Sequence, residues 1–211
     1  MIKNPLYTKC LNFDFKSLFE KKGYAYFTKG EYNLNIIGVR ANNNNKVTNL
    51  YDDILVVIYN TPTKTQRVLY NITTEPGLYF MEHKLGNVKG TAILVPGQYR
   101  STWKIDKHRG KYDALCQRKV VKVYRDNNMD DVYDLDPNKI DKGLFGINIH
   151  RSNQWYARET IDQYSAGCQV FNSPTDFTAF MRLCYKQRDI FGNSFTYTLI
   201  DEKDLDNFRK D

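Results

Sequence analysis

The sequence predicts a mainly β fold of the β-rich α+β class, in which one or two helices cover a sheet. Seven segments are rich in Val, Ile, Tyr and Thr, and several of them alternate polar with apolar residues. Two other segments carry helix signals, and short loops rich in Asn, Asp, Gly or Pro separate the elements. The length of 211 residues suits one domain, or one domain with a small extension.

The β-rich segments define the strands that we expect. They are residues 33–40, 54–59, 67–72, 91–95, 119–124, 143–149 and 194–200. No internal repeat and no polar linker divides the chain.

Two helices are expected from caps and from apolar spacing. The first covers residues 14–22, where Asp14 is placed to cap the start and Gly23 to end the helix. The second begins at the capping box of residues 173–176, with Pro174 at the first helical position. Its apolar residues follow a helical spacing and predict a packing helix: Phe177, Phe180, Met181 and Cys184.

Composition limits the classes of function and location. No run of 18 apolar residues is present, so we expect no transmembrane helix and no stable membrane insertion. Residues 1–5 lack the apolar run of a signal peptide, which predicts a product that is cytoplasmic on synthesis. The net charge of +7 favours anionic partners. However, the basic residues are scattered and no nucleic-acid-binding signature is present, so we expect no nucleic acid partner.

The four cysteines form no CxxC pair, which argues against a zinc ribbon or a redox motif. No cofactor motif is present either, and we therefore expect no metal and no cofactor. Cys184 lies on the apolar face of the second helix and Cys116 in a β-rich segment, so both are expected to pack in the core.

The strongest chemical signal lies between residues 146 and 171. His150 stands at the end of an apolar strand, and Cys168 follows 18 positions later. A thiol becomes a good nucleophile when a nearby imidazole removes its proton, and the same imidazole can later protonate a leaving group. The sequence therefore offers a Cys168–His150 pair for attack on an acyl carbon. The alternative is an ordinary strand-end histidine and a buried thiol.

Small residues precede the candidate nucleophile. Ser165, Ala166 and Gly167 leave space for a substrate, and the glycine permits a sharp turn. Such a turn can aim backbone N–H groups at a developing oxyanion, where each donor contributes about 3 kcal/mol.

These residues resemble the signature of the YkuD-type L,D-transpeptidase catalytic domain. That signature has a strand-end His, a gap of similar length and then Ser-His-Gly-Cys, and the chain matches it at His150, Ser165, Gly167 and Cys168. Upstream, residues 73–80 (TTEPGLYF) resemble the family's T-P-x-G-x-F/Y hairpin. The resemblance implies a YkuD-like β-sandwich or barrel with one or two covering helices.

The same resemblance divides the chain and suggests its chemistry. It implies an L,D-transpeptidase-like catalytic domain over residues 51–211 and leaves residues 1–50 as a packed extension with a helix and the first strand. Two positions depart from the family: Ala166 replaces a second His, and Val170 replaces an Arg or Asn that is expected to hold the turn or to bind a substrate carboxylate. Gln169 is the candidate replacement donor.

Several phrases also resemble small proteins of tailed phages that infect gut bacteria. They are GQY at 97–99, HRGKYDAL at 108–115, FGINIHR at 145–151, SAGCQVF at 165–171 and FTYTL at 195–199. Phage lysis enzymes wait in the cytosol for a membrane pore. The resemblance therefore implies an endolysin-like role, with action in the host periplasm or cell wall.

Other polar and aromatic residues are candidates for contact with substrate. Residues 97–115 correspond to a lid over the cleft in the family resembled, which implicates Tyr99, His108 and Tyr112. Arg151 is a candidate partner for a substrate carboxylate. The alternative is an ordered surface loop and a solvated arginine.

Two further roles remain open within the His–Cys segment. The imidazole of His150 requires a group that orients it, and Asn148, Asn153 or a backbone carbonyl would serve. Trp155 and Tyr156 lie between His150 and the cysteine and are expected to wall the cleft.

The sequence is therefore compatible with three functions. The first is a cysteine peptidase that forms a Cys168 acyl-enzyme on peptidoglycan stem peptides and resolves it with water. The second is a true L,D-transpeptidase, in which an amine resolves the acyl-enzyme and forms a cross-link. The third is a non-catalytic phage protein that binds the wall or serves a structural role on the same fold.

Overall fold

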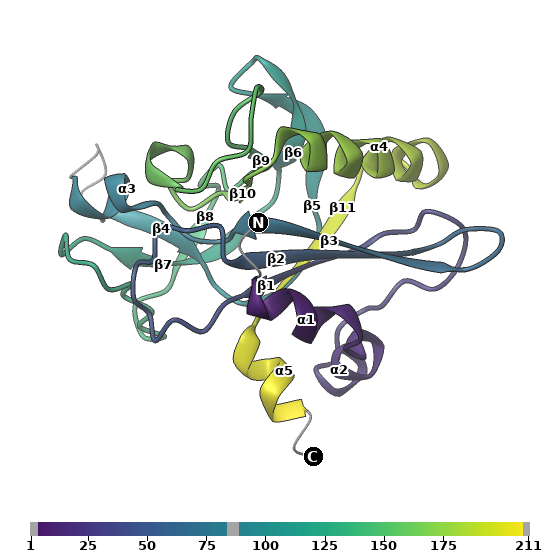
Figure 1. Cartoon of the computed structure of the whole chain (residues 1–211), viewed down its shortest axis with the longest axis horizontal. Coiled ribbons are helices and arrows are strands. Elements are labelled where there is room, and N and C mark those ends of the chain that lie inside the picture. The colour runs from purple at the N-terminus through teal and green to yellow at the C-terminus, as the bar shows by residue number, and fades with distance from the viewer. Residues whose placement is uncertain (1–3, 84–88, 209–211) are drawn as a thin grey trace.

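The computed structural model describes residues 4–83 and 89–208 (Figure 1). Within them, eight strands form a closed barrel and three form a separate small sheet, so the predicted mainly β class is confirmed. No helix among these residues is both long enough and apolar enough to cross a membrane.

The barrel strands follow one another in the order β1-β11-β5-β6-β9-β10-β3-β2. The pairs β1–β11 and β9–β10 are parallel, and the other neighbours are antiparallel. The bounds are β1 Asn35–Arg40, β2 Asp53–Asn60, β3 Thr65–Thr73, β5 Gly97–His108, β6 Tyr112–Gln117, β9 Ile149–Arg151, β10 Gln169–Phe171 and β11 Phe195–Asp201. The small sheet, in the order β4-β7-β8, contains β4 Thr91–Leu94, β7 Val121–Asp126 and β8 Asp141–Gly143.

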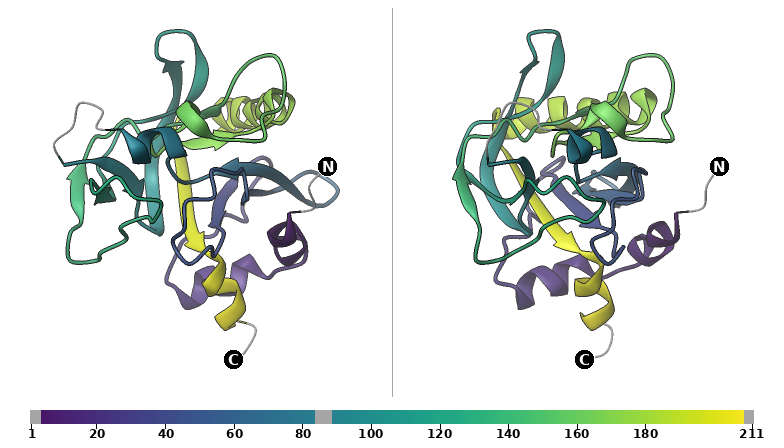
Figure 2. Two further views of the ribbon diagram at one scale, coloured as in Figure 1. Left: turned by 60° about the vertical axis from the view of Figure 1, so that its left-hand side comes forward. Right: turned by 90° about the vertical axis from the view of Figure 1, so that its left-hand side faces the viewer.

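Helices lie on two sides of the barrel (Figures 1 and 2). The long helix α4, Pro174–Phe191, lies on one side, and α1, α2 and α5 gather on the other. The short helices are α1 Pro5–Leu11, α2 Phe15–Lys21, α3 Leu78–Glu82, α5 Glu202–Phe208 and the 3-10 turn η1 Asp162–Tyr164.

This arrangement buries both faces of β1 and β2. Ile36 and Leu55 belong to the barrel core, together with Phe180 from α4. Ile37 and Ile54 belong to a second apolar cluster with residues from α1, α2 and α5. Burial on both faces explains why these strands are continuous apolar runs, since a strand with one solvated face alternates instead.

The N-terminal residues contribute to the barrel itself. β1 pairs with β11 on one side and with β2 on the other. The boundary predicted at residue 50 therefore falls between two neighbouring strands of one barrel.

Six of the seven predicted strands are confirmed to within two residues at each end. The two predicted helices are confirmed with their caps: Asp14 accepts from the backbone N–H of Ser17 at 3.1 Å, and Ser173 accepts from that of Asp176 at 3.2 Å. Cys184 and Cys116 are buried, as expected.

The strand predicted over residues 143–149 is wrong. Gly143 ends β8, and β9 begins only at Ile149. Between them, the side-chain oxygen of the buried Gln117 accepts from the backbone N–H of Phe145 at 3.2 Å and of Ile147 at 2.9 Å. A side chain thus takes the backbone donors that a continuous strand would pair.

Two segments predicted from the family resemblance have a different structure. Residues 97–115 are not a lid or a loop, because β5 and β6 form an antiparallel hairpin in the barrel wall. Residues 73–80 are not a hairpin: β3 ends at Thr73, and the chain turns into α3 at Leu78. The backbone N–H of Gly77, which a hairpin would pair, donates instead to the carbonyl oxygen of Ser165 at 2.9 Å.

Candidate functional site

Cys168 and His150 lie on the same outer face of the barrel wall. In the parallel pair β9–β10, Val170 is opposite His150, and Cys168 comes two residues before Val170. Side chains two residues apart on extended backbone point to one face. Cys168 and His150 therefore share a face, whereas Ile149 and Phe171 point into the barrel core. The predicted pair thus lies on one face, with His150 in β9 and Cys168 directly before β10.

A backbone carbonyl fixes the tautomer of His150. Its Nδ1 lies 2.9 Å from the carbonyl oxygen of Arg151, and the hydroxyl of Tyr112 donates to that same oxygen at 3.2 Å. Because a carbonyl only accepts, Nδ1 carries the proton and Nε2 keeps a free lone pair. Burial, together with the neighbouring His108, lowers the pKa of His150 to about 3, so the ring is neutral at pH 7. A neutral imidazole with a bare Nε2 has the form of a general base.

The two asparagines considered for this role act elsewhere. Asn153 caps its own loop, because its side-chain oxygen accepts from the backbone N–H of Trp155 at 2.7 Å and of Tyr156 at 3.0 Å. Asn148 serves a different histidine, His108.

His108 forms the layer against which His150 lies. The ring centroids are 4.1 Å apart and the planes are 21° from parallel. The side-chain oxygen of Asn148 accepts from the backbone N–H of Gln117 at 2.9 Å, so its amide nitrogen must be the atom 3.1 Å from Nδ1 of His108. Burial, together with the charge of Arg109, lowers the pKa of His108 to about 4. Two neutral rings can stack without charge repulsion.

The Cys168 thiol has two backbone neighbours. Its Sγ lies 3.4 Å from the carbonyl oxygen of Gly146 and 3.5 Å from the backbone nitrogen of Asn148. Burial raises the pKa of Cys168 to about 11, although the N–H of Asn148 and the charge of Arg109 oppose this shift. Within the described part of the chain, no hydrogen bond joins Sγ to His150. The resting thiol is therefore protonated, and it must turn away from Gly146 before His150 takes its proton.

The turn before Cys168 is held by Ser165 and requires glycine at position 167. The Ser165 hydroxyl donates to the carbonyl oxygen of Cys168 at 2.9 Å and accepts from the backbone N–H of Gly167 at 3.2 Å. Gly167 has a φ of +111°, and a Cβ there would lie 1.9 Å from the carbonyl oxygen of Ala92 in β4. Ser165 is fully buried. Both residues therefore shape the turn and do not face a substrate.

The segment that resembles the family's upstream motif lies against this turn. Its Gly77 is the residue that donates to the carbonyl of Ser165. The side chain of Asn49 links the same two segments, because its oxygen accepts from the backbone N–H of Leu78 at 3.0 Å and of Asp162 at 2.9 Å. The sequence alone contains no signal that would have identified Asn49.

A cavity of about 380 Å³ opens beside the two imidazoles. It brings together three predicted substrate contacts, His108, Tyr112 and Arg151, and the guanidinium carbon of Arg151 lies 4.3 Å from the ring centre of Tyr112. Cys168 itself is not among the lining residues. The full lining is His108, Arg109, Lys111, Tyr112, His150, Arg151, Ser152, Gln163 and Tyr164.

The other two predicted substrate contacts lie elsewhere. Gln169 is fully buried, accepts from the hydroxyl of Tyr197 at 2.7 Å and donates to the carbonyl of Gly167 at 3.4 Å. It follows Cys168 by one residue on an extended backbone and so points into the barrel. Tyr99 lies at the opposite end of β5 from the cavity, where its hydroxyl donates to the carbonyl of Val95 at 2.6 Å.

The predicted walls of the cleft also differ. Trp155 is 78% exposed and Tyr156 is 59% exposed, so neither is buried against a cleft.

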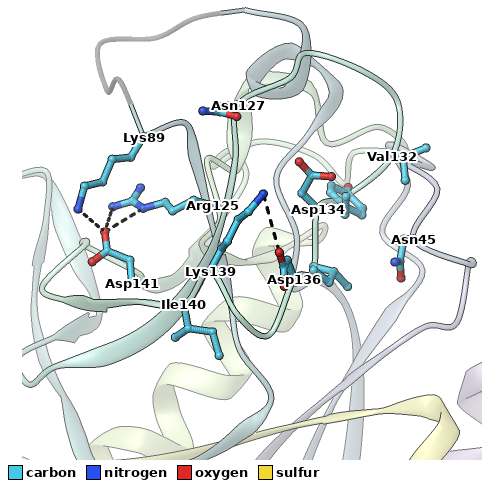
Figure 3. A pocket seen from close by; sticks show the side chains of 12 residues that line it. Asn45, Lys89, Arg125, Asn127, Val132, Asp134, Asp136, Lys139, Ile140 and Asp141 are labelled. Atoms are coloured by element: carbon cyan, nitrogen blue, oxygen red, sulfur yellow. Dashed lines mark hydrogen bonds and ion pairs between the residues drawn. The ribbon is translucent and has the colours of Figure 1, made fainter.

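A larger cavity, of about 730 Å³, lies beside the small sheet and the loop that follows β7 (Figure 3). Its charged side chains face one another: Arg125 lies 3.3 Å from Asp141, and Lys139 lies 3.8 Å from Asp136. None of its lining residues belongs to the face that carries His150 and Cys168.

Across residues 4–83 and 89–208, no three His, Cys, Asp or Glu side chains converge as metal ligands. No protein-family model, curated protein or solved structure matches the chain.

Proposed function

We propose that this protein is a cysteine-dependent acyl-transfer enzyme that acts on bacterial peptidoglycan stem peptides through a Cys168 acyl-enzyme. The observation that carries the proposal is the shared face of Cys168 and His150, with Nδ1 of the imidazole engaged by the Arg151 carbonyl and Nε2 left as a base. The adjacent cavity offers space for the acyl group.

Because the Cys168 thiol and the His150 imidazole are both neutral at rest, the proton moves during formation of the acyl-enzyme. Sγ attacks the acyl carbon while its proton passes to Nε2 of His150, and the carbonyl electrons move to oxygen in a tetrahedral intermediate. The imidazolium then protonates the amine, the electrons return from the oxygen, the C–N bond breaks and the thioester forms. No described hydrogen bond engages the backbone N–H of Cys168, which leaves this group to stabilise the oxyanion.

Water is the acceptor that we propose for the second step. His150 removes a proton from water, the resulting hydroxide attacks the thioester, and the products are a carboxylic acid and the free thiol. The resemblance to phage proteins supports hydrolysis, as does the departure from the family at Ala166 and Val170. The contact between Gly77 and Ser165 supports the YkuD-like interpretation, because it joins the two segments that resemble the family's motifs.

One observation favours a non-catalytic wall-binding protein instead. The thiol is directed at Gly146 and Asn148, and burial raises its pKa to about 11. An inert packing cysteine would have these same properties.

Purified sacculi distinguish these functions. We expect the wild-type protein to release soluble peptides that mass spectrometry identifies, and the variants Cys168→Ala and His150→Gln to release none. Cys116→Ala is the matched control, because it removes a buried thiol from β6 and should keep the activity. New cross-links without release would instead indicate a transpeptidase. Binding of sacculi with neither product would refute the enzyme and favour the wall-binding protein.

A further inference from the structure

The cavity beside His150 has an unusual balance of charge. Three cations line it, Arg109, Lys111 and Arg151, and no Asp or Glu is among its lining residues. Arg109 and Lys111 come from the turn between β5 and β6, whereas Arg151 is the last residue of β9. Two segments that are distant in the sequence thus supply positive charge to the same cavity.

These three cations have no acidic partner among the described ion pairs. Nearby cations of the same hairpin do have one: Lys107 pairs with Asp113 at 2.7 Å, and Arg118 pairs with Asp106. Arg109 and Lys111 thus stand at the cavity rim without an acidic partner among the described ion pairs, whereas the neighbouring Lys107 has one. Uncompensated charge in a concave site attracts ligands of opposite sign.

A neighbouring ring holds Arg151, and the turn that carries Arg109 and Lys111 has a defined backbone. Arg109 has a φ of +51° and Gly110 a φ of +70°, so the hairpin turn has a defined left-handed shape. Arg151 lies over the ring of Tyr112, whose hydroxyl donates to the Arg151 carbonyl. A guanidinium held in this way has already lost much of its freedom, which favours directional recognition of a carboxylate.

The same charge reaches the reacting groups. Arg109 lowers the pKa of Cys168, of His150 and of His108. The positive charge of Arg109 thus acts on the thiol and on both imidazoles.

We propose that this cavity selects acyl donors that carry a carboxylate near the bond attacked, and that Arg109 and Lys111 are the residues that determine this specificity. The inference rests on the proposed function, since it assumes that Cys168 is the nucleophile. It goes further by assigning the charge of the substrate and the cations that recognise it.

Two alkylating reagents of similar size test the selection without a known substrate. Iodoacetate is an anion and iodoacetamide is neutral, and the Cys168 thiolate displaces iodide from either one. We expect the ratio of the iodoacetate rate to the iodoacetamide rate at Cys168 to fall about fivefold in Arg109→Gln/Lys111→Gln, because two cations near the site are lost. The ratio of the wild-type protein should also fall in 0.5 M salt, where charges are screened.

The matched control is Lys46→Gln/Lys64→Gln, which removes two exposed cations that do not line the cavity and should leave the ratio unchanged. A circular dichroism spectrum like that of wild type shows that the cavity variant is folded, and the ratio of the two rates cancels any change in the thiolate fraction. If iodoacetamide modifies Cys168 rapidly but the ratio is the same in all three proteins, charge selection is refuted and the nucleophile stands. If both reagents modify Cys168 no faster than the buried Cys184, the proposed function itself is refuted.

Discussion

At the scale of single residues, the site is defined by two neutral groups. The backbone carbonyl of Arg151 holds the proton on Nδ1 of His150, and burial lowers the pKa of the ring to about 3. Burial also raises the pKa of Cys168 to about 11. A thiolate–imidazolium ion pair requires the opposite shifts, namely a lower thiol pKa and a higher imidazole pKa. The resting site therefore consists of two neutral groups and not of a preformed ion pair.

The pH dependence of thiol alkylation tests this assignment. Because the thiol pKa lies above its usual value, the fraction of thiolate should rise about tenfold for each pH unit between 7 and 10. The rate of iodoacetamide modification at Cys168, measured by mass spectrometry of the labelled peptide, should rise in parallel. A rate that is already constant between pH 5 and 8 would show a preformed ion pair and contradict the assignment.

The buried His108 should make folding sensitive to acid. Its pKa in the folded protein is lowered to about 4, so the unfolded chain binds a proton first as the pH falls below about 6.5. Stability from the neutral ring is thus complete above pH 6.5 and is lost as the pH falls to 4. We expect the stability advantage of wild type over His108→Gln to shrink by about 2–3 kcal/mol across that range, as measured by urea unfolding. A difference that does not vary with pH would contradict this.

At the scale of elements, the turn before Cys168 depends on its contact with the small sheet. In Gly167→Ala the new methyl would meet the carbonyl oxygen of Ala92 at 1.9 Å, at a φ of +111°. We expect a loss of about 3 kcal/mol or more in the free energy of unfolding, together with altered alkylation of Cys168.

Gly110→Ala is the matched control for that change. Gly110 has a φ of +70°, but a Cβ there meets nothing within 4 Å. It should cost only about 1 kcal/mol, the strain of a left-handed backbone. Equal costs for the two variants would show that contact with Ala92 is not what requires glycine at position 167.

Elements with local signals were predicted well, and elements decided by distant partners were not. Asp14 and Ser173 cap their helices through residues three positions away, so the sequence contains the whole signal. The interruption after Gly143 depends on Gln117, whose side chain takes backbone donors 28 and 30 positions further along the chain. The sequence does not predict the β5–β6 hairpin, because the charged residues at its outer positions resemble those of a solvated loop.

The residues of the candidate site divide in the same way, into those with a local sequence signal and those whose role depends on distant segments. The spacing of His150 and Cys168 indicated a pair, and β9–β10 pairing puts them on one face. The stacking of His108 on His150 and the contacts of Asn49 with Leu78 and Asp162 depend on segments that are far apart in the sequence. The sequence predicts a substrate contact for Gln169 because it follows the cysteine. Side chains alternate in direction along an extended backbone, however, and that of Gln169 points into the core.

At the scale of the whole molecule, one buried charge network joins the barrel to the small sheet. Arg40, at the end of β1, donates to the side chain of Thr74 at 3.0 Å and to the carbonyl of Leu94 in β4 at 3.0 Å, and lies 3.3 Å from Glu75. Asp53, at the start of β2, accepts from the backbone N–H of Thr74 at 2.6 Å. These contacts hold the segment that continues to Gly77 and the nucleophile turn.

Removal of Arg40 should therefore be costly and dependent on pH. Burial raises the pKa of Asp53 to about 7 and that of Glu75 well above its usual value, and Arg40 opposes both shifts. In Arg40→Leu the two carboxylates lose their cation, so we expect a loss of about 3–5 kcal/mol in the free energy of unfolding at pH 8. As the pH falls to 5.5 the carboxylates take up protons in the folded variant, and the loss should become smaller.

Chemical unfolding of this variant beside Arg118→Leu tests whether burial is the cause. Arg118 also pairs with a carboxylate, that of Asp106, but both side chains are more than 40% exposed. Exposed pairs are screened by water, so Arg118→Leu should change the unfolding free energy far less and with little dependence on pH in this range. Similar losses in both variants would mean that the Arg40 network adds no more than a surface pair. A large loss confined to Arg40→Leu, smaller at pH 5.5, would show that the barrel and the nucleophile turn are held together by buried charge.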